Sequence, residues 1–139
     1  LKDKVYYLET KGAVRIRVFD IPTGKNADAV TIGMTSESGY VVKSEIVNMV
    51  GDPSGNQFFF TTKDDMKGIK QFMTWKYDVL NQKYDVYCDG KALSLLPDNT
   101  LEVLFTGKDI TGEYQQKAYF NASYRKLLRQ DERVYGAVK

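Results

Sequence analysis

One short segment of this chain has the residue spacing of a catalytic pair. Ser123-Tyr-Arg-Lys126 matches the S-x-x-K pattern of serine–lysine acyl enzymes, in which one helical turn brings the lysine amine close to the serine hydroxyl. The other motifs that accompany S-x-x-K in those enzymes are missing from the sequence. We therefore interpret the segment as part of a solvated helix and expect no catalytic residue.

The composition removes most other routes to catalysis. The sequence has no histidine and one cysteine, Cys88. Without histidine, the commonest general base, the usual Ser-His and Cys-His pairs and most zinc sites are excluded. No basic partner for Cys88 is evident, so we expect it to pack as a small apolar residue.

Three aspartates near a predicted turn raise the question of calcium. Asp78, Asp85 and Asp89 would cluster if they met at one end of a hairpin. No D-x-D-x-D-G loop is present, and acidic residues also keep strand edges soluble. We favour this second interpretation. The segment 51–55 lacks the ending of a phosphate-binding loop, so we predict a turn there and expect neither metal nor cofactor.

A basic stripe near the C-terminus suggests nucleic acid as an alternative ligand. Arg125, Arg129 and Arg133 would share one face of a helix. Aromatic residues on strands stack bases in OB-like proteins, and the aromatic residues considered for this role are Tyr6, Tyr7, Phe58 and Tyr119. Against this, the net charge is only +2, and the arginines would otherwise face solvent or pair with Asp131 and Glu132.

Length and composition are those of a globular protein. The chain has 139 residues, with ten tyrosines, seven phenylalanines and one tryptophan. No apolar run approaches the roughly 18 residues of a membrane helix, so we expect no membrane insertion. A lone cysteine and the absence of a signal-peptide pattern favour a virion or cytoplasmic location over a secreted one.

Turn residues recur along the chain between short runs of β-branched and aromatic residues, which is typical of antiparallel β structure. Val14, Ile16 and Val18 alternate with Arg15 and Arg17, and Phe58-Phe59-Phe60 suits a strand buried on both faces. The predicted strands are Ala13–Phe19, Val30–Met34, Tyr40–Val47, Gln57–Thr61, Gln71–Val79, Tyr84–Cys88, Lys91–Leu95 and Leu101–Phe105.

Two local predictions depend on capping and turn chemistry. Thr62-Lys-Asp-Asp65 resembles a capping box, which favours one helical turn at 63–67, although alternation over 71–79 favours a strand afterwards. Asp89-Gly90 is typical of a type I′ turn, so the flanking strands are expected to pair as a two-residue hairpin.

The segment 113–134 lacks proline and glycine and predicts a helix. Thr111 or Ser123 would cap it. Its apolar stripe is the predicted partner-binding surface, formed by Phe120, Tyr124, Leu127 and Leu128.

Parts of the pattern resemble a known family. Ser44-Glu-Ile-Val47, Gly55-Asn-Gln-Phe-Phe-Phe60 and Thr62-Lys-Asp-Asp-Met66 resemble the middle of a phage baseplate upper-protein β-sandwich. Tyr77-Asp-Val79, Tyr84-Asp-Val86, Asp89-Gly90 and Leu95-Leu96 are similar to the closing strands of such Ig-like tail modules. The resemblance implies a sandwich followed by a helix that joins copies together.

The sequence thus predicts a mainly β protein, an Ig-like antiparallel sandwich over residues 1–112 with a C-terminal helix over 113–139. The predicted function is a non-catalytic structural or adaptor module of a multi-subunit complex, such as a phage tail. Its partners would be proteins or further copies of the chain. The alternative is a single-stranded nucleic-acid-binding, OB-like protein that uses the basic helix.

Overall fold

The computed structural model contains three antiparallel sheets. It describes residues 3–10, 14–30, 34–37, 40–66 and 69–136, and these contain no helix. The N-terminal sheet has the order β1-β2-β3, formed by β1 (Lys4–Glu9), β2 (Arg15–Asp20) and β3 (Lys25–Val30).

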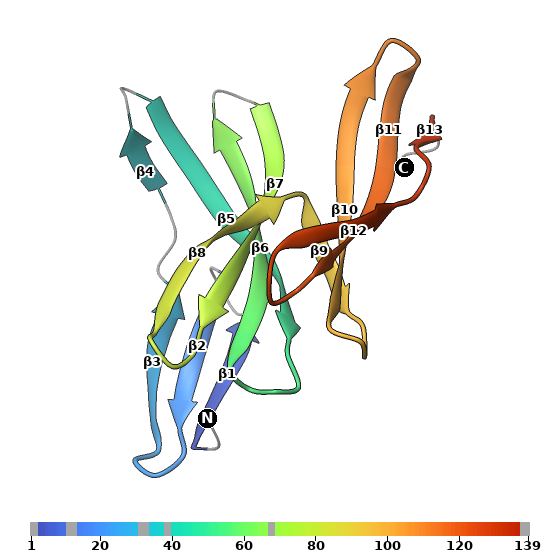
Figure 1. Cartoon of the computed structure of the whole chain (residues 1–139). Helices are drawn as coiled ribbons and strands as arrows, with labels where there is room; N and C mark the ends of the chain where they lie inside the picture. Colours follow the sequence, from blue (N-terminus) through green and yellow to red (C-terminus); the bar gives the residue numbers. More distant parts are fainter. Residues whose placement is uncertain (1–2, 11–13, 31–33, 38–39, 67–68, 137–139) are drawn as a thin grey trace.

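The central sheet has five strands in sequence order: β4 (Met34–Glu37), β5 (Tyr40–Gly51), β6 (Gln57–Met66), β7 (Ile69–Asp78) and β8 (Lys83–Asp89). The C-terminal sheet has the order β12-β11-β10-β9, with β13 paired to β11 beside β12. Its strands are β9 (Lys91–Leu95), β10 (Thr100–Asp109), β11 (Gly112–Asn121), β12 (Lys126–Gln130) and β13 (Val134–Tyr135). Figure 1 shows the N-terminal sheet at the lower left and the β10–β11 hairpin rising at the right.

Strand β6 places buried rings on both faces of the central sheet. Phe58, Phe59 and Phe60 are each at most 3% exposed. Successive side chains of a strand point to opposite faces, so Phe58 and Phe60 lie in one core and Phe59 in another. The prediction of a strand buried on both sides is confirmed.

The first core joins the N-terminal sheet to the central sheet. Ile16 and Val30 pack there with Ile46 and the Phe58 and Phe60 rings. Aromatic pairs reinforce this core, because Phe58 stacks on Tyr77 with ring centroids 4.7 Å apart. The second core joins the central sheet to the C-terminal sheet, and its buried members are Val50, Phe59, Tyr87, Ala92, Leu101, Val103 and Ala122.

The predicted Ig-like sandwich of two sheets is wrong. The structure has three sheets, and the central sheet is covered on both faces. The mainly β, antiparallel character of the prediction is confirmed. Strand β9 is held to the central sheet by polar contacts as well. The Ala92 N–H donates to Thr61 Oγ1 at 3.0 Å, and Asn48 Nδ2 donates to the Ala92 carbonyl at 2.6 Å.

The predicted C-terminal helix is wrong. Residues 112–121 form a strand that pairs with β10 over its whole length, and the chain then turns into β12. Asn121 explains the turn, because its Oδ1 accepts hydrogen bonds from the backbone N–H groups of Ser123 and Tyr124. Arg125 follows with a left-handed φ of 55°.

Neither expected helix cap has that role. Thr111 lies in the β10–β11 turn, where its N–H donates to Asp109 Oδ1 at 2.8 Å. The division of the chain after residue 112 into two domains stays a prediction, and it falls at the start of β11.

The helical turn predicted at 63–67 is also wrong over its described residues. Thr62–Asp65 continue strand β6, which pairs with β5 on one side and β7 on the other. Two ladders satisfy more backbone groups than one capping box does. The strand predicted at 71–79 is confirmed over 71–78, which belong to β7, and Val79 lies in the following turn. The strand predicted at Val30–Met34 does not form as one unit, since Val30 ends β3, Met34 begins β4, and 31–33 lie outside the described residues.

The Asp89-Gly90 hairpin is replaced by a crossing between sheets. Strand β8 pairs with β7, and β9 pairs with β10. Gly90 has φ 93°, and a Cβ atom there would lie 2.8 Å from Val103 Cγ1 and 2.9 Å from the Leu104 carbonyl oxygen. The glycine is therefore required for close approach to β10 as well as for its backbone angle.

We expect Gly90→Ala to lower the free energy of unfolding more than Gly24→Ala does. Both positions have positive φ, which costs a side chain about 1–2 kcal/mol. A Cβ at Gly24 meets open space, whereas at Gly90 it overpacks β10 for about 1–3 kcal/mol more. Urea denaturation measures the difference. Equal losses for the two variants would contradict the crossing.

Candidate binding edge of the C-terminal sheet

Strand β12 forms the open edge of the C-terminal sheet. Its residues Lys126–Gln130 pair with β11 on one side, and all five are exposed. Within the described part of the chain no strand pairs with its other side. An edge strand of this kind presents unpaired backbone N–H and C=O groups that another strand can bind.

Three of the four residues predicted for partner binding lie on this edge or just before it. Tyr124 is 82% exposed, Leu127 44% and Leu128 51%. Leu128 is the extra residue of a β-bulge, because Leu127 pairs with Phe120 and Arg129 pairs with Tyr119. Val134 of β13, which sequence reasoning missed, adds a further exposed apolar side chain.

The fourth predicted residue, Phe120, is half-buried. Its ring lies 6.2 Å from that of Tyr87 and 6.4 Å from that of Phe105, at the margin of the second core. The helical spacing that grouped it with Tyr124 does not apply, because Phe120 is in β11 and Tyr124 is in the turn that follows. Phe120 is the cross-strand partner of Leu127, but its ring packs at the margin of the second core, whereas Tyr124, Leu127 and Leu128 are exposed.

The arginine stripe predicted for nucleic acid is absent, since it required a helix. The Arg129 guanidinium lies 3.7 Å from the centre of the Tyr119 ring and 3.1 Å from Asp131 Oδ1. Asp131 also accepts the Tyr119 hydroxyl at 3.0 Å. This cation is therefore stacked and paired within the chain.

Arg133 is held in the same way. Its guanidinium lies 2.6 Å from Asp109 Oδ2 and 4.1 Å from the Tyr114 ring centre. The Tyr135 hydroxyl donates to the same carboxylate at 2.7 Å. These contacts, led by the Tyr135 hydrogen bond, lower the pKa of Asp109 from its ordinary value. We call Asp109, Arg133 and Tyr135 the latch, because they hold β13 against the β10–β11 hairpin.

The rings proposed for base stacking are largely inaccessible. Phe58 is 3% exposed and Tyr119 is 7% exposed. Tyr6 packs against the first core, and the Tyr7 hydroxyl donates to Asn26 Oδ1 at 2.6 Å on the outer face of the N-terminal sheet.

Arg125, the third residue of the expected stripe, lines a groove of about 570 Å³ together with Tyr124. The groove lies between the β7–β8 hairpin and the turn before β12. Its floor carries charged residues in cross-strand register, with Lys76 opposite Asp85 and Asp78 opposite Lys83. Opposite charges in such positions stabilise a sheet, so the floor is explained without a ligand.

The aspartates considered for calcium do not form a metal site. Asp78 and Asp85 line the groove with lysines between them, and the described residues contain no group of acidic or sulfur ligands that could hold a metal. Hydrogen bonds from the Asn81 side chain and from the backbone N–H groups of Asn81 and Leu80 lower the pKa of Asp78. These bonds close the β7–β8 turn.

Cys88 and Ser123 both make packing or hydrogen-bond contacts within the protein. Cys88 packs against the second core, and burial raises the pKa of its thiol to about 12. A thiol with this pKa is a poor nucleophile at neutral pH. The contact with the second core confirms the prediction of a packed residue. Ser123 Oγ accepts a hydrogen bond from Asn99 Nδ2 at 2.8 Å, and Lys126 lies in β12 instead of one helical turn away.

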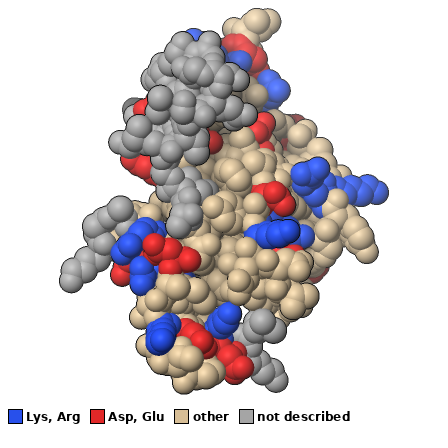
Figure 2. Space-filling view, turned by 90° about the vertical axis from the view of Figure 1, so that its left-hand side faces the viewer, with Lys and Arg blue, Asp and Glu red and all other residues tan. Residues whose placement is uncertain are grey.

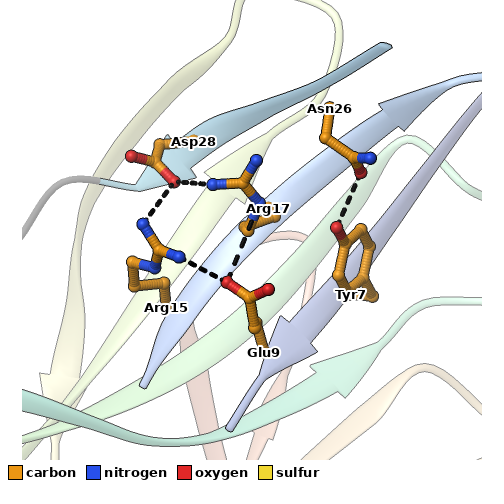
Figure 3. A network of polar contacts seen from close by, with 6 residues as sticks. All are labelled: Tyr7, Glu9, Arg15, Arg17, Asn26 and Asp28. Carbon is orange, nitrogen blue, oxygen red and sulfur yellow. Dashed lines mark hydrogen bonds and ion pairs between the residues drawn. The ribbon is translucent and has the colours of Figure 1, made fainter. Parts of the chain in front are cut away.

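The outer face of the N-terminal sheet carries a compensated charge network (Figure 3). Arg15 lies 2.6 Å from Glu9, and Arg17 lies 2.8 Å from Asp28. Figure 2 shows acidic and basic side chains next to one another on the side of the molecule it presents. The described residues on that side form no continuous surface of one charge.

No protein family model, curated protein or solved structure matches this chain. The part of the chain that the structure describes has no helix able to span a membrane. The candidate site therefore rests on the geometry of the C-terminal sheet.

We expect Asp109→Asn to loosen β13. The charged acceptor shared by Arg133 and Tyr135 is lost, so nuclear Overhauser contacts between the Tyr114 and Tyr135 rings, 6.0 Å apart, should weaken. Asp98→Asn, in an exposed turn, is the control.

The same latch predicts a pH dependence. Because the folded-state pKa of Asp109 is lowered, its contribution is complete above the ordinary value of 3.8 and is lost as pH falls through the lower folded-state value. The wild-type ring contacts should therefore approach those of the variant only below about pH 4. Equal contacts in both proteins at neutral pH would contradict the latch.

Proposed function

We propose that this protein is a non-catalytic assembly module that joins copies of itself through β12. The observation that carries the proposal is the exposure of every residue of β12, with two adjacent leucines on a strand that, among the described residues, pairs on one side only. Exposed apolar side chains beside unpaired backbone groups are what a strand-pairing interface uses.

The sequence of β12 is compatible with pairing to its own copy. An antiparallel pair of β12 strands centred on Leu128 places Lys126 opposite Gln130 and Leu127 opposite Arg129 of the second copy. No two like charges then face each other directly, and the contact is two-fold symmetric. The lysine, the arginine and the bulge protect the edge against unspecific strand pairing.

The surroundings of β12 support this use. Arg129 is neutralised by Asp131 and stacked on Tyr119, so bringing two copies together does not confront two free guanidinium groups. Tyr124 and Val134 lie at the two ends of the edge and extend its exposed apolar surface. The resemblance of the strand and turn pattern to phage baseplate upper proteins supports a place in a multi-subunit complex, such as a phage tail.

The test is the oligomeric state in solution. We expect the wild-type protein to sediment as a concentration-dependent dimer, and the double variant Leu127→Glu with Leu128→Glu to sediment as a monomer with unchanged circular dichroism. Each glutamate removes an apolar contact and brings a desolvation cost at the paired edge. Sedimentation equilibrium over about a hundredfold range of concentration measures the change in the monomer–dimer equilibrium. That range corresponds to about 3 kcal/mol of binding free energy.

Leu80→Glu is the matched control. Leu80 is 74% exposed in the turn after β7, far along the chain from β12, so this variant replaces an exposed leucine by glutamate elsewhere and should dimerise like the wild type. A wild-type protein that stays monomeric throughout, or a dimer that the double variant does not weaken, would contradict the proposal.

A further inference from the structure

The groove between the β7–β8 hairpin and the turn before β12 has the size of a small-molecule site. Its volume of about 570 Å³ lies within the range of about 300–1,000 Å³ that is typical of ligand pockets. Strands β7 and β8 and the turn between them form one side, and Ser123, Tyr124 and Arg125 form the other. Both sides belong to one chain, so a ligand there does not require pairing of β12 with a second copy.

The charges that line the groove leave one cation in excess. Of the five charged residues of the described chain that line it, four are matched across the strands, with Lys76 opposite Asp85 and Asp78 opposite Lys83. Arg125 is the fifth, and it has no ion-pair partner within 4.0 Å among the described residues. The excess positive charge of the groove is therefore that of Arg125.

Acidic residues around the groove limit the charge of a ligand. Asp89 lies at the end of β8, and Asp98 lies in the exposed turn before β10. Within the described part of the chain, neither lines the groove or forms an ion pair with Arg125. Together with Asp78 and Asp85 on the groove floor, they would repel a polyanion. The groove consequently suits a ligand with a single negative charge.

Contacts in the turn hold the backbone of Arg125 in a conformation that side chains rarely adopt. Arg125 has a φ of 55°, its N–H donates to the Asn121 carbonyl at 2.9 Å, and the Tyr87 hydroxyl donates to the same carbonyl at 2.9 Å. Burial raises the pKa of Tyr87 to about 12, and the nearby positive charge of Arg125 opposes this rise. Arg125 is thus positioned at the groove by the fold, and its planar guanidinium matches a carboxylate.

Uncharged groups of the groove are those that a sugar ring can use. Tyr124 on one side is 82% exposed and Val86 on the other is 44% exposed, so both offer apolar surface. Ser123 Oγ already accepts a hydrogen bond, which leaves its proton to donate. The Asn81 amide nitrogen is bonded to Asp78, which leaves the Asn81 side-chain oxygen as an acceptor.

We propose that this groove binds a small acidic saccharide, a sugar ring that carries one carboxylate, as uronic acids do. The carboxylate pairs with Arg125, and the C–H face of the ring packs on Tyr124 and Val86. Hydroxyl groups both donate and accept hydrogen bonds, which suits the donor of Ser123 and the acceptor of Asn81. The inference goes beyond the proposed function, because it assigns a ligand to a groove that self-assembly does not use.

The probes are glucuronate, galacturonate and mannuronate, each added to the wild-type protein up to about 10 mM. We expect at least one of them to shift the backbone amide NMR signals of residues 83–87 and 123–125 in a saturable way. Glucose, galactose and mannose lack the carboxylate, and acetate lacks the ring. Each of these four compounds should bind at least about tenfold more weakly than the best uronate.

Arg125→Gln removes the unmatched charge and should weaken uronate binding at least about tenfold, with unchanged circular dichroism. Lys126→Gln is the matched control, because it removes the same charge from the next residue, which does not line the groove. It should change the affinity by less than about twofold. If Arg125→Gln does not fold, the comparison of uronates with hexoses and acetate decides the question.

Three results would overturn the proposed saccharide site. None of the three uronates shifts the groove signals at about 10 mM. Acetate binds as tightly as the best uronate, which would reduce the site to an arginine that attracts any small anion. Arg125→Gln and Lys126→Gln weaken uronate binding equally.

Discussion

Three consecutive buried phenylalanines on β6 are the constraint on which the rest of this structure depends. A strand turns successive side chains to opposite faces, so Phe58-Phe59-Phe60 requires apolar cover on both sides of the central sheet. The N-terminal sheet covers Phe58 and Phe60, and the C-terminal sheet covers Phe59. A two-sheet sandwich offers each strand one buried face, which explains why a third sheet is present.

The way the third sheet is attached determines where edges stay open. The C-terminal sheet reaches the central sheet through β9 and the buried part of β10, whereas the β10–β11 hairpin continues past this contact. Its strand edges are consequently satisfied by short elements only: β9 on one side, and β12 and β13 on the other. The proposed binding edge, β12, follows from this incomplete coverage.

Period-two alternation and turn chemistry predicted much of the fold. The apolar residues of β2, the Phe58-Phe59-Phe60 run and the strand over 71–79 were predictable, because each depends on which faces are buried. Which strands pair with one another could not be predicted in this way. Asp89-Gly90 has the composition of a hairpin turn, but the contact of Gly90 with β10 decides its conformation and is invisible in the local sequence.

The C-terminal segment was mispredicted because its composition favours a helix and its apolar residues fit helical spacing. The decisive signals were Asp109 and Gly112, which close the β10–β11 turn, and Asn121, which caps the next turn. Once 112–121 is a strand, Phe120 turns to the core. Leu127 and Leu128 remain exposed, so part of the candidate site was identified for the wrong structural reason.

The most direct test of the central claim, two separate cores on the two faces of β6, is a pair of double-mutant cycles. Phe59→Ala and Leu101→Ala share the second core and should be coupled by roughly 0.5–3 kcal/mol in the free energy of unfolding. Phe60→Ala lies in the first core and should be additive with Leu101→Ala within about 0.5 kcal/mol. Coupling of Phe60 to Leu101 as strong as that of Phe59 would contradict the three-sheet arrangement.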